Sequence, residues 1–180
     1  MLKWKRNKKM IAKFIAGIII LTILITAQPI NAANAQEYLA SGMQKTESGK
    51  FREAIMDFDK VIQLDPNQAK AYQYRGVAKA KYGDFAGAII DYDNAIEKDS
   101  NNTDSYSSRG IAKARLGNLT GAIVDFDVAL ELNPKDGNAY FNHGMAMEMS
   151  GEVQRACLDW EQSVELGHEQ AINFVRKYCS

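Results

Sequence analysis

The sequence predicts an all-α fold in which antiparallel helix pairs stack along one axis. Tyrosine, glycine, alanine and aromatic residues recur at intervals of 34 residues, and a period of this length is typical of stacked helical units. Within each period the apolar residues recur at helical spacing, which predicts two helices for each unit. The recurring positions are Tyr38, Tyr72, Tyr106 and Tyr140; Gly42, Gly76, Gly110 and Gly144; Gly49, Gly83, Gly117 and Gly151; Ala54, Ala88, Ala122 and Ala156; and Phe58, Tyr92, Phe126 and Trp160.

Residues 1–35 precede the repeats and have the composition of a secretory signal peptide. Basic residues are concentrated before position 14, an apolar run follows over residues 14–27, and Ala33-Asn34-Ala35 supplies a small-x-small cleavage site. The apolar run is shorter than the roughly 20 residues that a membrane-spanning helix needs. We expect cleavage after Ala35, with cleavage after Ala32 as the second choice and an uncleaved signal anchor as the alternative. In each case the repeats would lie outside the cytoplasm, in the periplasm or the medium.

One repeat shows why two helices are expected. Residues 70–82 and 85–96 each carry apolar or small residues at helical spacing. Gly83 separates the two segments, because glycine accepts the left-handed conformation at a helix end, and Asp84 can cap the second helix. Proline after the second helix of a unit, as at Pro66, disfavours its continuation.

Two stretches of sequence resemble the tetratricopeptide repeat family: YRGVAKAKYGDFAGAIIDYDNAIEKD and SRGIAKARLGNLTGAIVDFDVALELNP. On this resemblance the solenoid covers residues 36–168, in units 35–68, 69–102, 103–136 and 137–170, of which the last is degenerate. The resemblance implies a right-handed superhelix with a concave groove that binds proteins or peptides. A further amphipathic helix over residues 169–180, after the break at Gly167, is expected to cap the stack.

Charge and composition narrow the partners. The chain carries 22 basic and 22 acidic residues, and removing the basic residues of the N-terminal segment leaves 16 basic against 22 acidic, a net charge of −6. This charge argues against nucleic acid, and it limits membrane contact to the N-terminal segment if that segment stays uncleaved. No phosphate-binding loop, nucleophile elbow or zinc spacing is found, so we expect neither an enzyme nor a cofactor.

An aspartate recurs once in each unit, opposite a basic residue in the next unit. We expect ion pairs between units that set the register of the stack, because partly buried charges normally find partners. A charged ligand site is the alternative interpretation. The expected pairs are Asp57 with Arg75, Asp91 with Arg109, and Asp125 with His143.

Sulfur-containing residues near the C-terminus raise two further questions. His143 is followed by Met145, Met147 and Met149, and thioether ligands in an exported protein suggest copper. On a helix Met147 would point away from the other two, so we expect no metal and interpret the methionines as packing or groove lining.

The two cysteines, Cys157 and Cys179, lie at similar distances on either side of Gly167. In a helical hairpin this spacing brings the two sulfur atoms together, so we expect a disulfide in an exported chain. Two unpaired thiols are the alternative.

The resemblance also implies which side chains line the groove. Some family members grip a C-terminal carboxylate with lysine, arginine and asparagine, but here the matching places hold Gln73, Val77, Ser108 and Asn142. An extended or helical segment with apolar side chains is therefore the expected ligand. A structural or assembly role through self-association, without a peptide ligand, is the alternative. The groove set is Leu39, Met43, Gln73, Tyr74, Val77, Ser107, Ser108, Ile111, Phe141, Asn142, Met145 and Met149.

Overall fold

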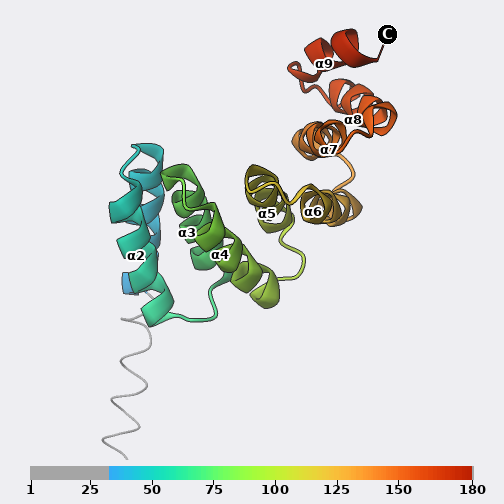
Figure 1. Cartoon of the computed structure of the whole chain (residues 1–180). Coiled ribbons are helices and arrows are strands. Elements are labelled where there is room, and N and C mark those ends of the chain that lie inside the picture. The colour runs from blue at the N-terminus through green and yellow to red at the C-terminus, as the bar shows by residue number, and fades with distance from the viewer. Residues whose placement is uncertain (1–32, 180) are drawn as a thin grey trace, which may run out of the picture.

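The computed structural model describes residues 33–179, and within this range it is entirely helical, without strands. A helix over residues 33–47 comes first, and Figure 1 shows the later helices following one another along a curved path to the C-terminus. The all-α solenoid with a C-terminal helix is therefore confirmed. The later helices are α2 (Phe51–Leu64), α3 (Ala69–Tyr82), α4 (Phe85–Lys98), α5 (Thr103–Arg115), α6 (Leu119–Leu132), α7 (Gly137–Met149), α8 (Val153–Glu165) and α9 (Ala171–Tyr178).

Each helix packs on its neighbours in sequence, which is why the stack is linear. The pairs α3–α4, α5–α6 and α7–α8 are hairpins, and α4–α5 and α6–α7 join one hairpin to the next. The hairpin turns follow the sequence prediction: Gly83 ends α3 with a φ of +97°, and the Asp84 carboxylate accepts a hydrogen bond from the Gly87 amide at the start of α4. Helix α9 packs on α8 at the end of the stack.

The recurring glycine and the recurring aromatic residue form one contact. A Cβ atom placed on Gly76 would lie 2.7 Å from the Tyr92 ring, so only glycine lets α3 approach α4 this closely. The same relation holds between Gly144 and the Trp160 ring, again at 2.7 Å. The aromatic side chains are almost fully buried, and each forms the centre of the core of its helix pair.

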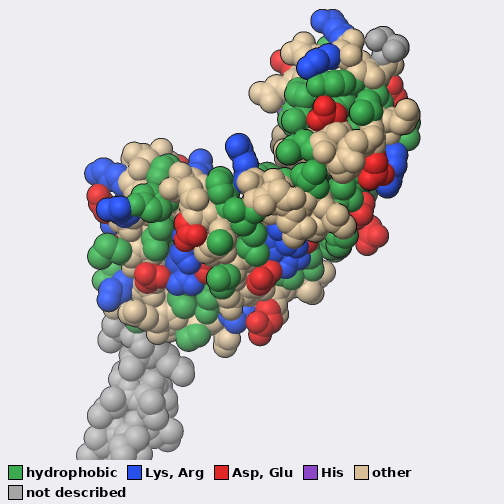
Figure 2. Space-filling view, viewed as in Figure 1, with side chains coloured by type: hydrophobic (Ala, Val, Ile, Leu, Met, Phe, Trp, Pro, Cys, Tyr) green, Lys and Arg blue, Asp and Glu red, His purple; other side chains and the backbone are tan. Residues whose placement is uncertain are grey.

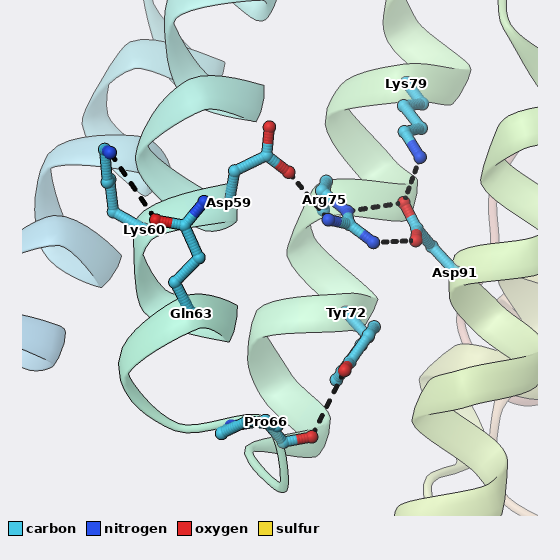
Figure 3. Close-up of polar contacts among 8 residues, drawn as sticks. All are labelled: Asp59, Lys60, Gln63, Pro66, Tyr72, Arg75, Lys79 and Asp91. Carbon is cyan, nitrogen blue, oxygen red and sulfur yellow. Dashed lines mark hydrogen bonds and ion pairs between the residues drawn. The ribbon is translucent and has the colours of Figure 1, made fainter.

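The ion pairs expected between units are wrong, because each arginine binds aspartates other than the one predicted for it. The Arg75 guanidinium binds both oxygens of Asp91, in its own helix pair, at 3.0 and 2.6 Å (Figure 3). Its remaining nitrogen reaches back to Asp59 of the preceding pair at 2.6 Å, and Lys79 also contacts Asp91 at 2.8 Å. Asp57 binds Lys45 within its own pair instead of Arg75.

The close approach of the helices within a pair explains this correction. Arg75 precedes Gly76 and Asp91 precedes Tyr92, so the contact between glycine and ring places arginine and aspartate opposite each other. Burial opposes the charge of the Arg75 guanidinium, but its bonds to Asp91 and Asp59 outweigh burial and raise its pKa above the usual value.

The same correction applies further along the chain. Arg109 binds Asp125 of its own pair and Asp93 of the preceding pair, and does not bind Asp91. His143 does not pair with Asp125. Its Nδ1 atom lies 2.9 Å from Asp159 Oδ2 and its Nε2 atom lies 3.4 Å from Asp127 Oδ1, and neither contact has hydrogen-bond geometry. Arg75 and Arg109 therefore do link successive units by ion pairs. The aspartate in each link is Asp59 or Asp93, two positions after the one predicted.

The N-terminal segment assigned to a signal peptide falls mostly on residues 1–32, outside the described range. Ala35, its expected last residue, lies within the first helix, is 3% exposed, and packs with Val61 and Ala71. Cleavage after Ala35 would remove this contact, whereas cleavage after Ala32 would keep it. Among the helices of residues 33–179, none combines the length and apolar character needed to cross a membrane.

Candidate functional site

The first helix of each pair lines one side of the curved stack. Helices α3, α5 and α7 contact one another in succession, and Figure 2 shows a hollow between the body that contains α3 and α4 and the lobe that contains α7 to α9. None of the twelve predicted groove residues is fully buried. Their side chains therefore remain accessible, as a binding surface requires.

An apolar cleft of about 370 Å³ lies between α5 and α7. The structure brings five of the predicted groove residues together there, two of them well exposed, with Ile111 at 39% and Met149 at 55%. The cleft is of the size and apolar character that ligand pockets have. The five are Ile111, Phe141, Asn142, Met145 and Met149.

Four residues of the cleft were missed by the sequence interpretation. Phe126 and Ala146 belong to the core beneath the cleft, while Ala114 and Arg115 lie at the end of α5. Arg115 is exposed and makes no ion pair within residues 33–179. The repeat period could have identified Arg115 as a groove residue, because it precedes the predicted groove residue Met149 by one period of 34 residues.

Phe141 is held in place by the C-terminal end of the stack. Its ring stacks on His168 at 4.5 Å and meets Phe174 of α9 edge-on at 5.2 Å. The structure also contains the disulfide between Cys157 of α8 and Cys179 after α9, with the Cα atoms 5.5 Å apart. The cap therefore supports one wall of the cleft.

The methionines separate as helical geometry requires. Met145 and Met149 line the cleft, whereas Met147 is 1% exposed and packs in the core with Trp160. The adjacent His143 is also buried and faces the two carboxylates of Asp127 and Asp159. Met147 therefore lies apart from Met145 and Met149, as the sequence interpretation expected.

The N-terminal part of the groove is less open. Leu39, Met43 and Tyr74 pack against the Phe58 core, and the Tyr74 ring stacks on Phe58 at 6.1 Å. Val77 packs in the same way against the next core. Each of these side chains is partly buried against the core, and only the remainder of its surface faces the groove.

The middle of the groove is polar. The Gln73 amide donates to Asp104 at 3.4 Å and accepts from Asn102 at 3.0 Å, which joins α3 to the start of α5. Ser107 and Ser108 are half-buried beside them. The apolar cleft between α5 and α7 is therefore the part of the predicted groove with the greatest capacity to bind an apolar side chain. A larger hollow of about 750 Å³ is lined mainly by polar loop residues next to α7 and α9.

Comparison with known proteins agrees with this architecture. Residues 33–103 match the family model described as tetratricopeptide repeat. No curated protein sequence matches the chain. A crystal structure of MamA is similar at 25% identity and a TM-score of 0.71, covering 77% of this chain and 81% of that chain.

Two further solved structures are tetratricopeptide repeat domains. The first TPR of Spaghetti (RPAP3), bound to the HSP90 peptide SRMEEVD, is 27% identical with a TM-score of 0.65, and the match covers 66% of this chain and 94% of that chain. The Arabidopsis OM64 TPR domain is 24% identical with a TM-score of 0.65, covering 66% and 98%. The family match covers residues 33–103, and the stacked helix pairs together with these neighbours show that the described part of the chain has the fold of tetratricopeptide-repeat proteins.

Proposed function

We propose that this protein binds a polypeptide segment with apolar side chains in its concave groove, with the cleft between α5 and α7 as the main contact. The observation that carries the proposal is the convergence of five predicted groove residues on one accessible apolar cleft. A structural neighbour bound to a peptide supports the same use of the fold. The volume of about 370 Å³ suits one large side chain of a ligand.

The energetic contribution of the cleft follows from burial. Placing one large aliphatic or aromatic side chain out of water yields about 1.5–3 kcal/mol. Such anchors usually carry most of the binding energy of an interface. Ile111, Met145 and Met149 surround this position with flexible or branched apolar side chains, which adapt to ligands of different shape.

The test is selection of peptides from a random display library with the full chain as bait. We expect the selected peptides to share a large apolar residue, and the Ile111→Gln/Met149→Gln variant to weaken their binding by about tenfold or more. Leu132→Gln is the matched control, because Leu132 is 40% exposed at the end of α6 and outside the cleft. Selection of no peptide, or equal binding by the groove variant, would refute the proposal.

We further propose that the repeats act outside the cytoplasm after removal of the N-terminal segment. The order of basic residues, apolar run and small-x-small site supports export. The burial of Ala35 favours cleavage after Ala32, because the core contact with Val61 and Ala71 is then retained.

N-terminal sequencing of the protein from fractionated cells tests this location. We expect a mature chain that begins at Ala33 in the extracytoplasmic fraction. A chain that begins at Gln36 would show that the Ala35 contact is dispensable. Intact Met1 in the cytosolic fraction would contradict export altogether.

A further inference from the structure

The outer surface of the stack carries an aliphatic residue at one repeated position. The second helix of each pair, α2, α4, α6 and α8, presents this residue to solvent, with exposed fractions from 54% to 67%. Successive members are separated by the repeat period of 34 residues. We call this set the outer aliphatic row: Met56, Ile90, Val124 and Leu158.

Folding of the single chain does not explain this row. Exposed aliphatic residues scattered over a surface are common, but these occupy the same position on the second helices of four successive pairs. Each stays largely in contact with water, so it contributes little to the core of its own pair. A repeated exposed apolar position is the pattern expected of an interaction surface.

Carboxylates accompany the row on three of the helices. On a helix, residues three and seven positions after a given residue lie on the same face. In α4, α6 and α8 both of these positions are acidic, and all six side chains are exposed. The two acidic rows are Asp93, Asp127 and Glu161, and Glu97, Glu131 and Glu165.

The second acidic row has no internal partner. Asp93 binds Arg109, and Asp127 lies near His143. Glu97, Glu131 and Glu165 form no ion pair within residues 33–179. Three unpaired carboxylates beside an apolar row give this surface a defined charge preference.

We propose that the outer face of α4, α6 and α8 docks a basic polypeptide segment of a partner protein, whose aliphatic side chains contact the outer aliphatic row and whose lysine or arginine residues pair with the second acidic row. The repeat spacing means that such a segment crosses successive helices. This surface is separate from the concave groove, which the first helices line, so the protein would hold two partners on opposite faces.

The charge of the face decides between possible occupants. A second copy placed with its own outer face against this one would bring acidic rows together, and like charges at an interface are unfavourable. An anionic membrane surface is repelled for the same reason. A segment with both basic and aliphatic side chains satisfies both features of the face.

A short synthetic peptide of alternating leucine and lysine residues serves as the probe, and its binding to the full chain is measured by fluorescence anisotropy. We expect Ile90→Gln/Val124→Gln/Leu158→Gln to weaken binding by about tenfold or more. Glu97→Gln/Glu131→Gln/Glu165→Gln should also weaken binding and reduce its dependence on salt. The groove variant Ile111→Gln/Met149→Gln is the matched control and should bind the probe like the unmodified chain, because the exposed Arg115 beside the cleft repels a lysine-rich peptide.

Several outcomes would overturn the proposal. Equal loss of binding in the groove variant would place the probe in the concave groove. Equal binding of a peptide of alternating leucine and glutamate would remove the charge argument. A dimer in sedimentation that Val124→Gln dissociates would make a second copy the occupant, and binding to phosphatidylglycerol vesicles that Val124→Gln abolishes would make a membrane the occupant. Circular dichroism confirms that each variant is folded, and Val124→Gln alone replaces the triple variant if that variant fails to fold.

Discussion

The joint around Arg109 and the joint around His143 occupy the same place in successive helix pairs, but different interactions hold them together. Arg109 forms three hydrogen bonds that link Asp125 of its own pair to Asp93 of the preceding pair. His143 lies near the corresponding carboxylates without hydrogen-bond geometry. We call the arrangement in which one arginine binds an aspartate of its own pair and an aspartate of the preceding pair the charged clamp. At the C-terminal joint the hydrogen bonds of this clamp are missing.

Packing and a covalent bond take over where the clamp weakens. Met147 occupies the position that Lys113 holds one unit earlier, and it is buried with Trp160 instead of pairing with an aspartate. Phe174 and Tyr178 of α9 pack on the Trp160 ring at 5.0 and 5.5 Å. The same repeat position thus forms an ion pair inside the stack, through Lys113, and packs against an aromatic core at the end of the stack, through Met147.

The largest expected effect comes from breaking the charged clamp. Asp91 is fully buried, so Asp91→Ala leaves Arg75 and Lys79 without their shared carboxylate and should lower the free energy of unfolding by roughly 3–5 kcal/mol. Urea unfolding of the single and double variants measures the coupling. We expect strong coupling between positions 91 and 75 and none between 91 and 109; the reverse result would restore the pairing expected from the sequence.

Removing the disulfide should have the next largest effect. The loop between Cys157 and Cys179 spans 22 residues, so Cys157→Ser/Cys179→Ser should cost about 3 kcal/mol of stability in the chain-entropy model. Hydrogen exchange should become faster in α9, while α3 and α4 keep their protection. Unchanged exchange in α9 would mean that aromatic packing alone holds the cap.

A matched pair of substitutions compares the two joints directly. Asp125→Asn and Asp159→Asn remove one charge at equivalent positions, beside Arg109 and His143 respectively. We expect the second to cost about 1 kcal/mol or less, because the Asp159 contact is partly exposed and poorly aligned. Thermal unfolding of both variants under one buffer condition gives the comparison. Equal losses would show that His143 acts as a clamp like the arginines.

The smallest expected change in stability concerns Tyr92, which follows Asp91 in the sequence, and it appears only at high pH. Burial, opposed by a hydrogen bond with Ser108, raises the pKa of Tyr92 to about 12 from a usual value of 10.0. A raised pKa stabilises the fold fully below pH 10, and this contribution is lost as pH rises towards about 12.

Tyr92→Phe should therefore reduce the loss of stability between neutral pH and about pH 11 by about 1 kcal/mol. Phe126 occupies the equivalent place in the next pair and provides the natural precedent for the ring without a hydroxyl. Urea unfolding at the two pH values measures the difference. Identical pH dependence of the two proteins would show that Tyr92 ionises in the folded state as easily as in the unfolded chain.

Much of the fold followed from the repeat period. The recurrence of apolar residues at helical spacing within each period predicted two helices for each unit, and the breaks at Gly83 and Gly167 predicted where helices end. The groove positions came from the resemblance to the tetratricopeptide repeat family, and five of them converge on one cleft. The ion-pair partners did not follow, because residues 57 and 59 are two positions apart on one helix and only the packing angle decides which of them Arg75 reaches.

The sequence by itself therefore determined the helix pairs and their order, because these depend on local spacing repeated along the chain. Tertiary structure alone decided the openness of the groove, the support of Phe141 by His168 and Phe174, and the exposure of the outer aliphatic row. These features depend on how successive pairs are rotated against one another. That rotation is set by side-chain packing between units, which no single period of the sequence contains.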